Sequence, residues 1–183
     1  MKRKRLQRKP DTRSINELNS DLFTESPDDR FQNPLEARKK AMDYLARREY
    51  GQRELEIKLA NAGFDADVSV TAVEQLRSDG LQDDHRFAEA FARSRVNQGK
   101  GPTRVSGDLR QRGVASSLTE AVLEQMSVDW FALAAEVREK KFGSALPTDF
   151  KEKARQMRFL QYRGFEQSHI QAAMQGAREM GSE

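Results

Sequence analysis

The chain has 183 residues, of which 37% are apolar and 33% are charged, so we expect a small core beneath a densely charged surface. The absence of cysteine excludes disulfides, thiolate zinc sites and cysteine nucleophiles, and the absence of a long apolar run excludes a transmembrane helix. The formal net charge is only +3, so the positions of the charges along the chain are more informative than their total.

Residues 1–34 differ in composition from the rest and are predicted to form a disordered arm. A basic cluster occupies positions 2–13, and an acidic and polar stretch with few large apolar residues follows it. The arm contains no apolar segment of a secretory signal, so we expect a cytoplasmic protein. Two interpretations of the basic tip stay open: it contacts nucleic acid electrostatically, or it is a solubilising tail.

Residues 35–80 are predicted to form a first module of three amphipathic helices, because apolar residues recur there at helical spacing. The residues expected to face its core are Ala37, Ala41, Tyr44, Leu45, Leu55, Leu59, Ala62, Val70, Val73 and Leu76. Gly51 either ends the first helix or caps the second. Asp67 is expected to cap the third helix, which Gly80 closes.

Residues 81–126 repeat this scheme and are predicted to form a second module. The residues expected to face its core are Phe87, Ala88, Phe91, Val105, Leu109, Ala121 and Val122. Asp83 is expected to cap the first helix, and Pro102 suits the first turn of the second because its missing N–H needs no partner there. Ser117 and Glu120 have the spacing of a capping box, which predicts that the third helix opens at Ser117.

Residues 127–183 are predicted to form a third module with a loop at 143–147. The residues expected to face its core are Trp130, Phe131, Leu133, Ala134, Val137, Met157, Leu160, Ile170, Ala173 and Met174. Each module is too small to bury a sufficient core alone. We therefore expect an all-α protein in which three tandem three-helix modules stack into an elongated, curved body.

Three short signatures support this repeat. They are Leu59-x-x-x-Gly63-Phe64, Leu109-x-x-x-Gly113-Val114 and Leu160-x-x-x-Gly164-Phe165. The glycines recur at steps of 50 and 51 residues, which is the mark of a repeat architecture. Each signature predicts a helix end, at which a leucine packs inward, a glycine adopts the left-handed conformation and the next apolar residue folds back.

Basic residues concentrate in the second and third modules. Residues 84–114 carry seven basic residues against three acidic ones, and residues 151–165 carry five against one. The residues expected to make contacts are, first, Arg104, Arg110, Arg112, Arg155, Arg158 and Arg163, and then Arg47, Arg93, Arg95 and Lys100. Such a basic stripe suits a phosphate backbone or an acidic protein groove. The alternative is a solvated helix face with ion pairs inside each module.

Other candidate sites are not supported by the residues. His85 follows Asp83 and Asp84, but adjacent helical positions do not share a face, so no metal site is predicted. The stretch Gly99-Lys100-Gly101 lacks the upstream glycine and the following Ser or Thr of a phosphate-binding loop. No catalytic motif occurs in the chain, so we expect neither a cofactor nor enzymatic activity.

The repeats and several fixed stretches together resemble the RecX family of regulatory proteins. The matching stretches are Ala41–Arg47, Glu54-Leu55 with Leu59, Gly80–Ala88, Gly101–Val105 with Leu109 and Gly113, Asp129-Trp130, and Arg158–Phe165. The resemblance covers roughly residues 35–174 and implies an all-helical, three-module, curved fold. The arm is longer than the family core requires.

The resemblance also implies a function, namely negative regulation of the RecA recombinase in homologous recombination, DNA repair and the SOS response. Family members bind in the groove of the RecA filament on single-stranded DNA. There they inhibit filament extension, ATP hydrolysis, strand exchange and coprotease activity. We accordingly expect a monomer that binds this filament and binds nucleic acid weakly by itself. The alternative is an autonomous nucleic-acid-binding protein that uses the basic stripe.

Overall fold

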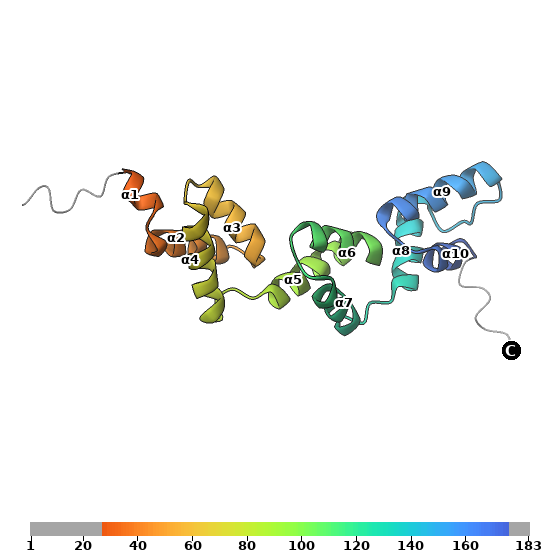
Figure 1. Ribbon diagram of the computed structural model, residues 1–183. Helices are drawn as coiled ribbons and strands as arrows, with labels where there is room; N and C mark the ends of the chain where they lie inside the picture. Colours follow the sequence, from red (N-terminus) through yellow and green to blue (C-terminus); the bar gives the residue numbers. More distant parts are fainter. Residues whose placement is uncertain (1–26, 176–183) are drawn as a thin grey trace, which may run out of the picture.

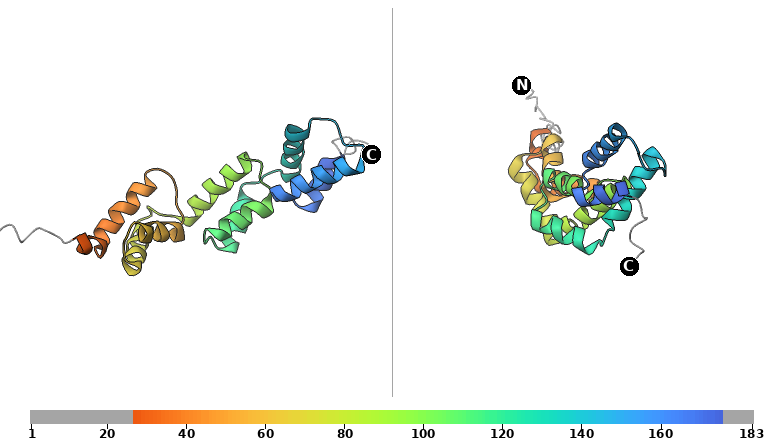
Figure 2. Two further views of the ribbon diagram at one scale, coloured as in Figure 1. Left: turned by 90° about the horizontal axis from the view of Figure 1, so that it is seen from above. Right: turned by 90° about the vertical axis from the view of Figure 1, so that its right-hand side faces the viewer.

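The computed structural model describes residues 27–175, and within this range the chain forms ten α-helices and no strands. The helices group into three modules that follow one another in an elongated row (Figure 1). The row is also seen from above, whereas in the end-on view the modules overlap (Figure 2). The predicted all-α stack of three modules is thus confirmed. The basic tip of the arm and residues 176–183 lie outside the described residues.

The first module contains α2 (Pro34–Leu45), α3 (Gln52–Asn61) and α4 (Ala66–Ser78), preceded by the short α1 (Pro27–Phe31). Its buried apolar core consists of Ala37, Ala41, Tyr50, Leu55, Leu59, Phe64, Ala72, Val73 and Leu76. Residues 27–34, which were assigned to the disordered arm, are helical or cap a helix. The Asn33 side chain accepts a 2.9 Å hydrogen bond from the backbone N–H of Leu35, and the Phe31 ring packs edge-on against Phe64. These contacts order the end of the predicted arm.

The second module contains α5 (Asp84–Asn97), α6 (Pro102–Gln111) and α7 (Ser116–Gln125). Its buried apolar core consists of Phe87, Ala88, Ala92, Val105, Leu109, Val114 and Val122. As predicted, the Asp83 side chain caps α5, by accepting hydrogen bonds from the backbone N–H groups of His85 and Arg86. Pro102 occupies the first turn of α6, also as predicted.

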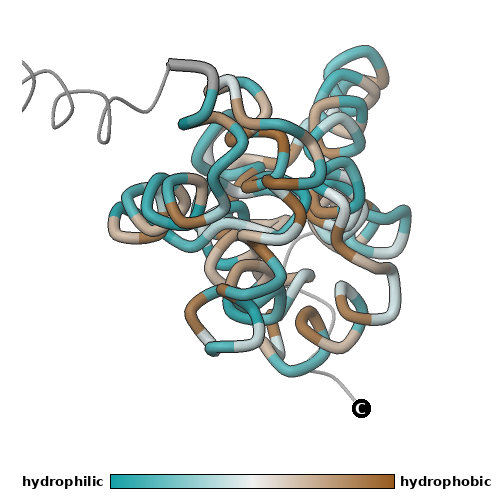
Figure 3. Tube along the Cα trace, turned by 60° about the vertical axis from the view of Figure 1, so that its left-hand side comes forward, coloured by the Kyte–Doolittle hydropathy of each residue, from teal (hydrophilic) through white to brown (hydrophobic). Residues whose placement is uncertain are grey.

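The third module contains α8 (Trp130–Phe142), α9 (Phe150–Arg163) and α10 (Gln167–Gln175). Its buried apolar core consists of Ala134, Leu160, Phe165, Ile170, Ala173 and Met174. Figure 3 shows hydrophobic and hydrophilic residues interspersed along the helices, as expected where one side of a helix is buried. Between residues 27 and 175, no helix is both long enough and apolar enough to span a membrane.

The three predicted helix ends have one shared geometry. Gly63, Gly113 and Gly164 have φ angles of +102°, +86° and +88°. The residue after each glycine donates a backbone hydrogen bond to the carbonyl of the leucine four residues before that glycine, over 3.1–3.2 Å. This 6→1 bond is the Schellman helix end, so the interpretation of the repeated signature is confirmed.

Two predicted helix starts are wrong by one or two residues. The N-cap position of α4 is Asp65 rather than Asp67, and α7 begins at Ser116 with Ala115 as its N-cap, so no capping box forms at Ser117. The cause is the helix end that precedes each start. Phe64 or Val114 folds into the core directly after the glycine, and the next helix begins two residues later.

Two residues predicted to face a core are exposed. Val70 is 38% exposed, because Ser69, Val73 and Leu76 occupy the inner face of α4. Phe131 is 51% exposed and packs its ring edge-on against His169, with centroids 4.7 Å apart, whereas its neighbour Trp130 packs against the second core. Gly51 is the N-cap of α3, which decides between the two roles proposed for it.

Candidate basic interface

The second helices of the three modules, α3, α6 and α9, meet end to end. Gly113 at the end of α6 lies against the side chain of Arg53 in α3, and Gly164 at the end of α9 lies against Arg104 in α6. At the second meeting point, the backbone N–H of Gly101 donates to the carbonyl of Arg163 over 2.9 Å. Basic residues at the end of α9 are therefore brought beside those at the start of α6.

A pocket opens on the second module along α6, between the two ends at which α6 meets α9 and α3, and we call it the junction pocket. It is an open depression of about 480 Å³, and its lining residues are Arg95, Lys100, Arg104, Asp108, Gln111 and Arg112. Four of the ten predicted contact residues thus converge on one place, from α5, α6 and the segment between them. Asp108 and Gln111 were not among the predicted contact residues, although Asp108 lies four residues after Arg104, the spacing at which helical side chains pair.

Ion pairs hold the arginines of the junction pocket in place. Asp108 lies between two guanidinium groups, with Nε of Arg95 at 3.2 Å and Nε of Arg104 at 3.0 Å. Glu54 of the first module is shared in the same way, by Arg48 at 2.7 Å and Arg112 at 3.5 Å. Arg95 and Arg104 thus make ion pairs inside one module, as the alternative of a solvated face expects, whereas Arg112 pairs across two modules.

The pocket nevertheless carries an excess of positive charge, because four cations line it with one carboxylate. Burial lowers the pKa of Lys100, and the nearby charges of Arg163, Arg104 and Arg95 lower that pKa further, while Asp108 opposes the change. A bound anion would remove this repulsion. The arrangement is therefore suited to binding phosphate or carboxylate groups.

An aromatic ring lies beneath two of the pocket's arginines. The guanidinium carbons of Arg95 and Arg112 are each 4.7 Å from the ring centroid of Phe91, which we had expected only in the core. Arg163 lines a separate depression with Gln98 and Phe159, where its Nη1 donates to the carbonyl of Gln98 over 2.8 Å and its guanidinium carbon is 5.1 Å from the ring centroid of Phe159. These contacts hold the arginines above apolar surface and point their charge outward.

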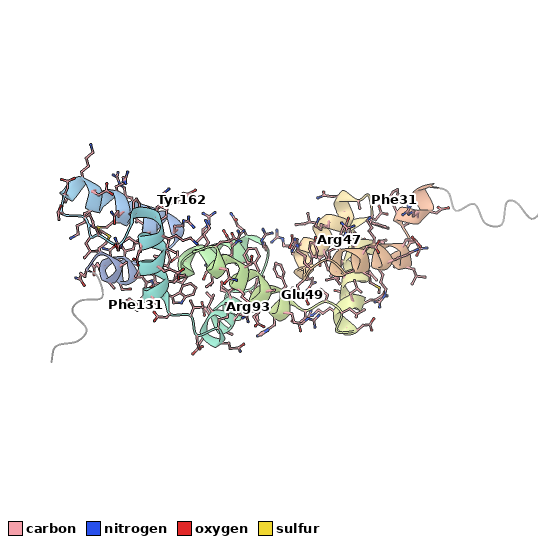
Figure 4. The ribbon with its side chains drawn as sticks, turned by 180° about the vertical axis from the view of Figure 1, so that it is seen from behind. Phe31, Arg47, Glu49, Arg93, Phe131 and Tyr162 are labelled. Carbon is pink, nitrogen blue, oxygen red and sulfur yellow. The ribbon has the colours of Figure 1, made fainter. Side chains whose placement is uncertain are left out.

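Three other predicted residues lie apart from the junction pocket. Arg110 lines a separate depression of about 90 Å³ with Glu120, and Arg93 pairs with Glu89 at 2.6 Å on α5. Arg47 follows α2 in the first module, and Figure 4 shows Arg47 and Arg93 on different modules. Among the described residues, the side chains of Arg47 and Arg110 make no hydrogen bond or ion pair.

The remaining two predicted residues lie on the outer face of α9. Arg155 pairs with Glu152 at 3.0 Å, and Nε of Arg158 donates to the carbonyl of Ala154 over 3.3 Å. Both are exposed, as are Lys151 and the aromatic Tyr162. The structure thus divides the predicted stripe into a junction pocket and a separate surface on α9.

His85 and its acidic neighbours Asp83 and Asp84 have structural roles. The backbone N–H of Arg86, ahead of a smaller effect from that of His85, lowers the pKa of Asp83, whose carboxylate caps α5. Asp84 accepts a 2.8 Å hydrogen bond from the backbone N–H of Gln52, which joins the first two modules. Nε2 of His85 lies 3.1 Å from the side-chain oxygen of Gln125.

Comparison with known proteins gives a consistent result. Family models described as the first, second and third three-helix domains of RecX match residues 37–76, 83–123 and 127–174. "Regulatory protein RecX" of Halorhodospira halophila is 48% identical over 139 residues, which are 76% of this chain and 86% of that protein. The protein of the same name from Ectopseudomonas mendocina is 38% identical, over 80% of this chain and 98% of that protein.

Two solved structures share the fold. A "Crystal structure of regulatory protein RecX" has a TM-score of 0.66 at 22% identity and covers 75% of this chain and 70% of its own. RecX from Lactobacillus salivarius has a TM-score of 0.65 at 20% identity and covers 78% of this chain and 94% of its own. The module boundaries predicted at residues 34, 80 and 126 stay predictions, since the family models mark only the matched segments.

Proposed function

The chain belongs to the RecX family, and on that premise we propose that it is a negative regulator of the RecA recombinase that binds in the groove of the RecA filament on single-stranded DNA. It inhibits filament extension, ATP hydrolysis, strand exchange and coprotease activity. It acts as a cytoplasmic monomer by binding rather than by catalysis.

The observation that carries this proposal is the junction pocket. A filament groove presents acidic protein surface and DNA phosphates together, and a rigid cluster of cations with too few internal partners is complementary to both. The pocket's lining residues all belong to the second module, the middle one of the row. The elongated body suits an extended groove (Figure 1). The regulatory names of its relatives favour a binding role.

The proposal is tested by measuring single-strand-dependent ATP hydrolysis by the cognate RecA while this protein is added from far below equimolar upward. We expect inhibition at ratios well below one protein per RecA, because blocking extension at a filament end or loosening the filament affects many subunits. Inhibition only at levels that coat the DNA would contradict the proposal. It would favour the autonomous nucleic-acid binder, whose affinity for single strands falls with salt at a log–log slope of about −0.7 per phosphate contact.

A double variant tests the junction pocket directly. Arg104→Gln with Arg112→Gln removes two cations, yet Asp108 keeps Arg95 and Glu54 keeps Arg48, so no carboxylate is left unpaired. We expect the concentration for half-inhibition to rise about tenfold, which corresponds to about 1.4 kcal/mol of binding free energy. Arg77→Gln is the matched control, because Arg77 is exposed on α4 of the first module, away from the pocket and outside the predicted contact residues. Equal inhibition by the double variant and the control would show that the pocket is only a solvated face.

A further inference from the structure

The outer face of α9 carries a stripe that the junction pocket does not use. Lys151, Arg155, Arg158 and Tyr162 follow one another at steps of four, three and four residues, which places them on one side of a helix. Phe150 lies at the start of the same helix. We call these five residues the α9 stripe. The opposite side of α9 buries Gln156 and Leu160 against α8 and α10.

The two aromatic rings of the α9 stripe are exposed to an unusual degree. Phe150 is 85% exposed and Tyr162 is 76% exposed, whereas Phe142 and Phe159 of the same module pack edge-on against each other. Figure 4 shows Tyr162 on α9 at the edge of the third module. Within residues 27–175, neither Phe150 nor Tyr162 makes an aromatic or cation–π contact. Rings left in water on a well-packed helix are available to a partner.

The charges along this face favour a polyanion. Two carboxylates lie near it: Glu152 pairs with Arg155 at 3.0 Å, and Asp149 caps the helix by accepting from the backbone N–H groups of Lys151 and Glu152. Arg158 bonds only to the backbone of its own helix. Lys151 has no ion-pair partner among the described residues. The three cations and the Tyr162 ring therefore share one face of α9, along about 16 Å of helix axis, while the Phe150 ring lies about 100° around the helix from Lys151.

We propose that the α9 stripe binds single-stranded nucleic acid, with Lys151, Arg155 and Arg158 at the phosphates and the Tyr162 ring stacked on a base. Alternating cations and exposed rings are what single-strand-binding surfaces share, because a single strand presents phosphates and unstacked bases together. A duplex hides its base faces, and an acidic peptide gives the rings nothing to stack on. The assignment deepens the proposed function, and it rests on that function in taking the strand to be the one inside the filament.

The test is fluorescence anisotropy of a labelled oligo-dT strand, without RecA, at several salt concentrations. Tyr162→Ala is expected to weaken binding about tenfold, since one base–aromatic stack is lost. Tyr162→Phe is the matched control and is expected to bind like the parent, because the ring is kept. Arg158→Gln is expected to make the log–log salt slope shallower by about 0.7.

A duplex of the same length and a polyglutamate chain complete the design. Tyr162→Ala should bind both of these as the parent does, because neither presents a base to the ring. Unchanged binding of oligo-dT by Tyr162→Ala overturns the assignment, and so does an equal loss of affinity for the strand and for polyglutamate, which would identify an acidic protein as the partner. Because Tyr162 is exposed, circular dichroism should show that the variant folds normally.

The two proposals fail in different experiments. The oligonucleotide assay contains no RecA, so a loss of binding by Tyr162→Ala supports the α9 stripe even if the parent protein does not inhibit RecA. Inhibition of RecA by a protein whose Tyr162→Ala variant binds oligo-dT normally would keep the proposed function and overturn the stripe.

Discussion

The junction between the second and third modules is made by backbone atoms. The backbone N–H of Gly101 donates to the carbonyl of Arg163 over 2.9 Å, and that of Thr103 donates to the carbonyl of Gly164 over 3.1 Å. The first N–H groups of α6 thus take up the last carbonyls of α9, which would otherwise lack partners. The two helices are joined almost as one.

The junction between the first and second modules is made by side chains. The buried amide of Gln82 donates to the carbonyl of Tyr50 over 3.2 Å and to Oδ1 of Asp84 over 2.8 Å. Arg86 adds an ion pair to Glu49, with Nε and Oε1 3.1 Å apart. No backbone-to-backbone hydrogen bond joins α3 to α6 among the described residues.

The two junctions occupy equivalent positions of the repeat, yet they have different mechanical roles. Side-chain bonds can lengthen or change partners without disturbing a helix, whereas the backbone bonds of the second junction cannot break without exposing helix ends. We therefore expect the second and third modules to move as one unit that carries the junction pocket. The first module is then attached by an adaptable joint.

A matched pair of glycine variants tests whether the two junctions differ in rigidity. Gly51 and Gly101 are both N-cap residues with φ near −70° and −79°, so backbone strain does not distinguish them. A Cβ on Gly101 would overlap the backbone of Gly164, whereas a Cβ on Gly51 would meet the Phe87 ring at 3.0 Å. Gly101→Ala should therefore lower the free energy of unfolding by about 3 kcal/mol, and Gly51→Ala by about 1 kcal/mol.

Urea denaturation followed by circular dichroism measures both variants. Native-state hydrogen exchange should locate the damage of Gly101→Ala at the start of α6 and the end of α9, with α2–α4 unaffected. Equal losses of stability in the two variants would mean that the two junctions are equally rigid, and the comparison would be wrong.

A smaller effect is expected at the side-chain junction. Asp84→Ala leaves the backbone N–H of Gln52 and the amide of Gln82 without their shared acceptor, which we expect to cost about 2 kcal/mol. Hydrogen exchange at the amide of Gln52 should speed up, while the exchange of Gly101 and Thr103 stays slow. Glu89→Ala on the exposed side of α5 serves as the control, because it removes only a surface ion pair with Arg93. Faster exchange at Gly101 in Asp84→Ala would contradict the independence of the junctions.

How far the sequence predicts these features depends on whether one helix or two are involved. The ends at Gly63, Gly113 and Gly164 were predictable because the helix-end motif lies within six consecutive residues. The face shared by Arg155 and Arg158 also followed from helical spacing, although the exposure of Tyr162 did not, since an aromatic residue is ordinarily assigned to a core.

Features that join two helices were not predictable. The charge balance counted Asp108 against the arginines but could not place it between Arg95 of α5 and Arg104 of α6. Likewise, Arg112 was predicted as a contact residue of the basic stripe, yet its ion-pair partner Glu54 belongs to the preceding module. Periodicity orients residues around each helix, whereas the distances between helices depend on packing that a single sequence does not encode in a readable pattern.

The smallest expected effect concerns Lys100, which lies beside Gly101 at the junction of the second and third modules. Its pKa is lowered by burial and by Arg163, Arg104 and Arg95, so the folded protein holds the charged form less favourably than the unfolded chain does. Lys100→Gln should therefore leave the free energy of unfolding at neutral pH unchanged or slightly higher, within about 0.5 kcal/mol. In the parent, stability should rise with pH through the lowered pKa toward the ordinary value for lysine, and the variant should lack this rise.

The same substitution should weaken inhibition of RecA, because the repulsion that burdens the free protein is what an anionic partner relieves. Thermal unfolding at neutral and alkaline pH, together with the ATP hydrolysis assay, separates the two effects. A variant that is less stable and inhibits normally would show that Lys100 is a structural residue with satisfied contacts. A variant that is at least as stable as the parent yet inhibits poorly would show that the positive charge of Lys100 costs stability in the free protein and serves to bind an anionic partner.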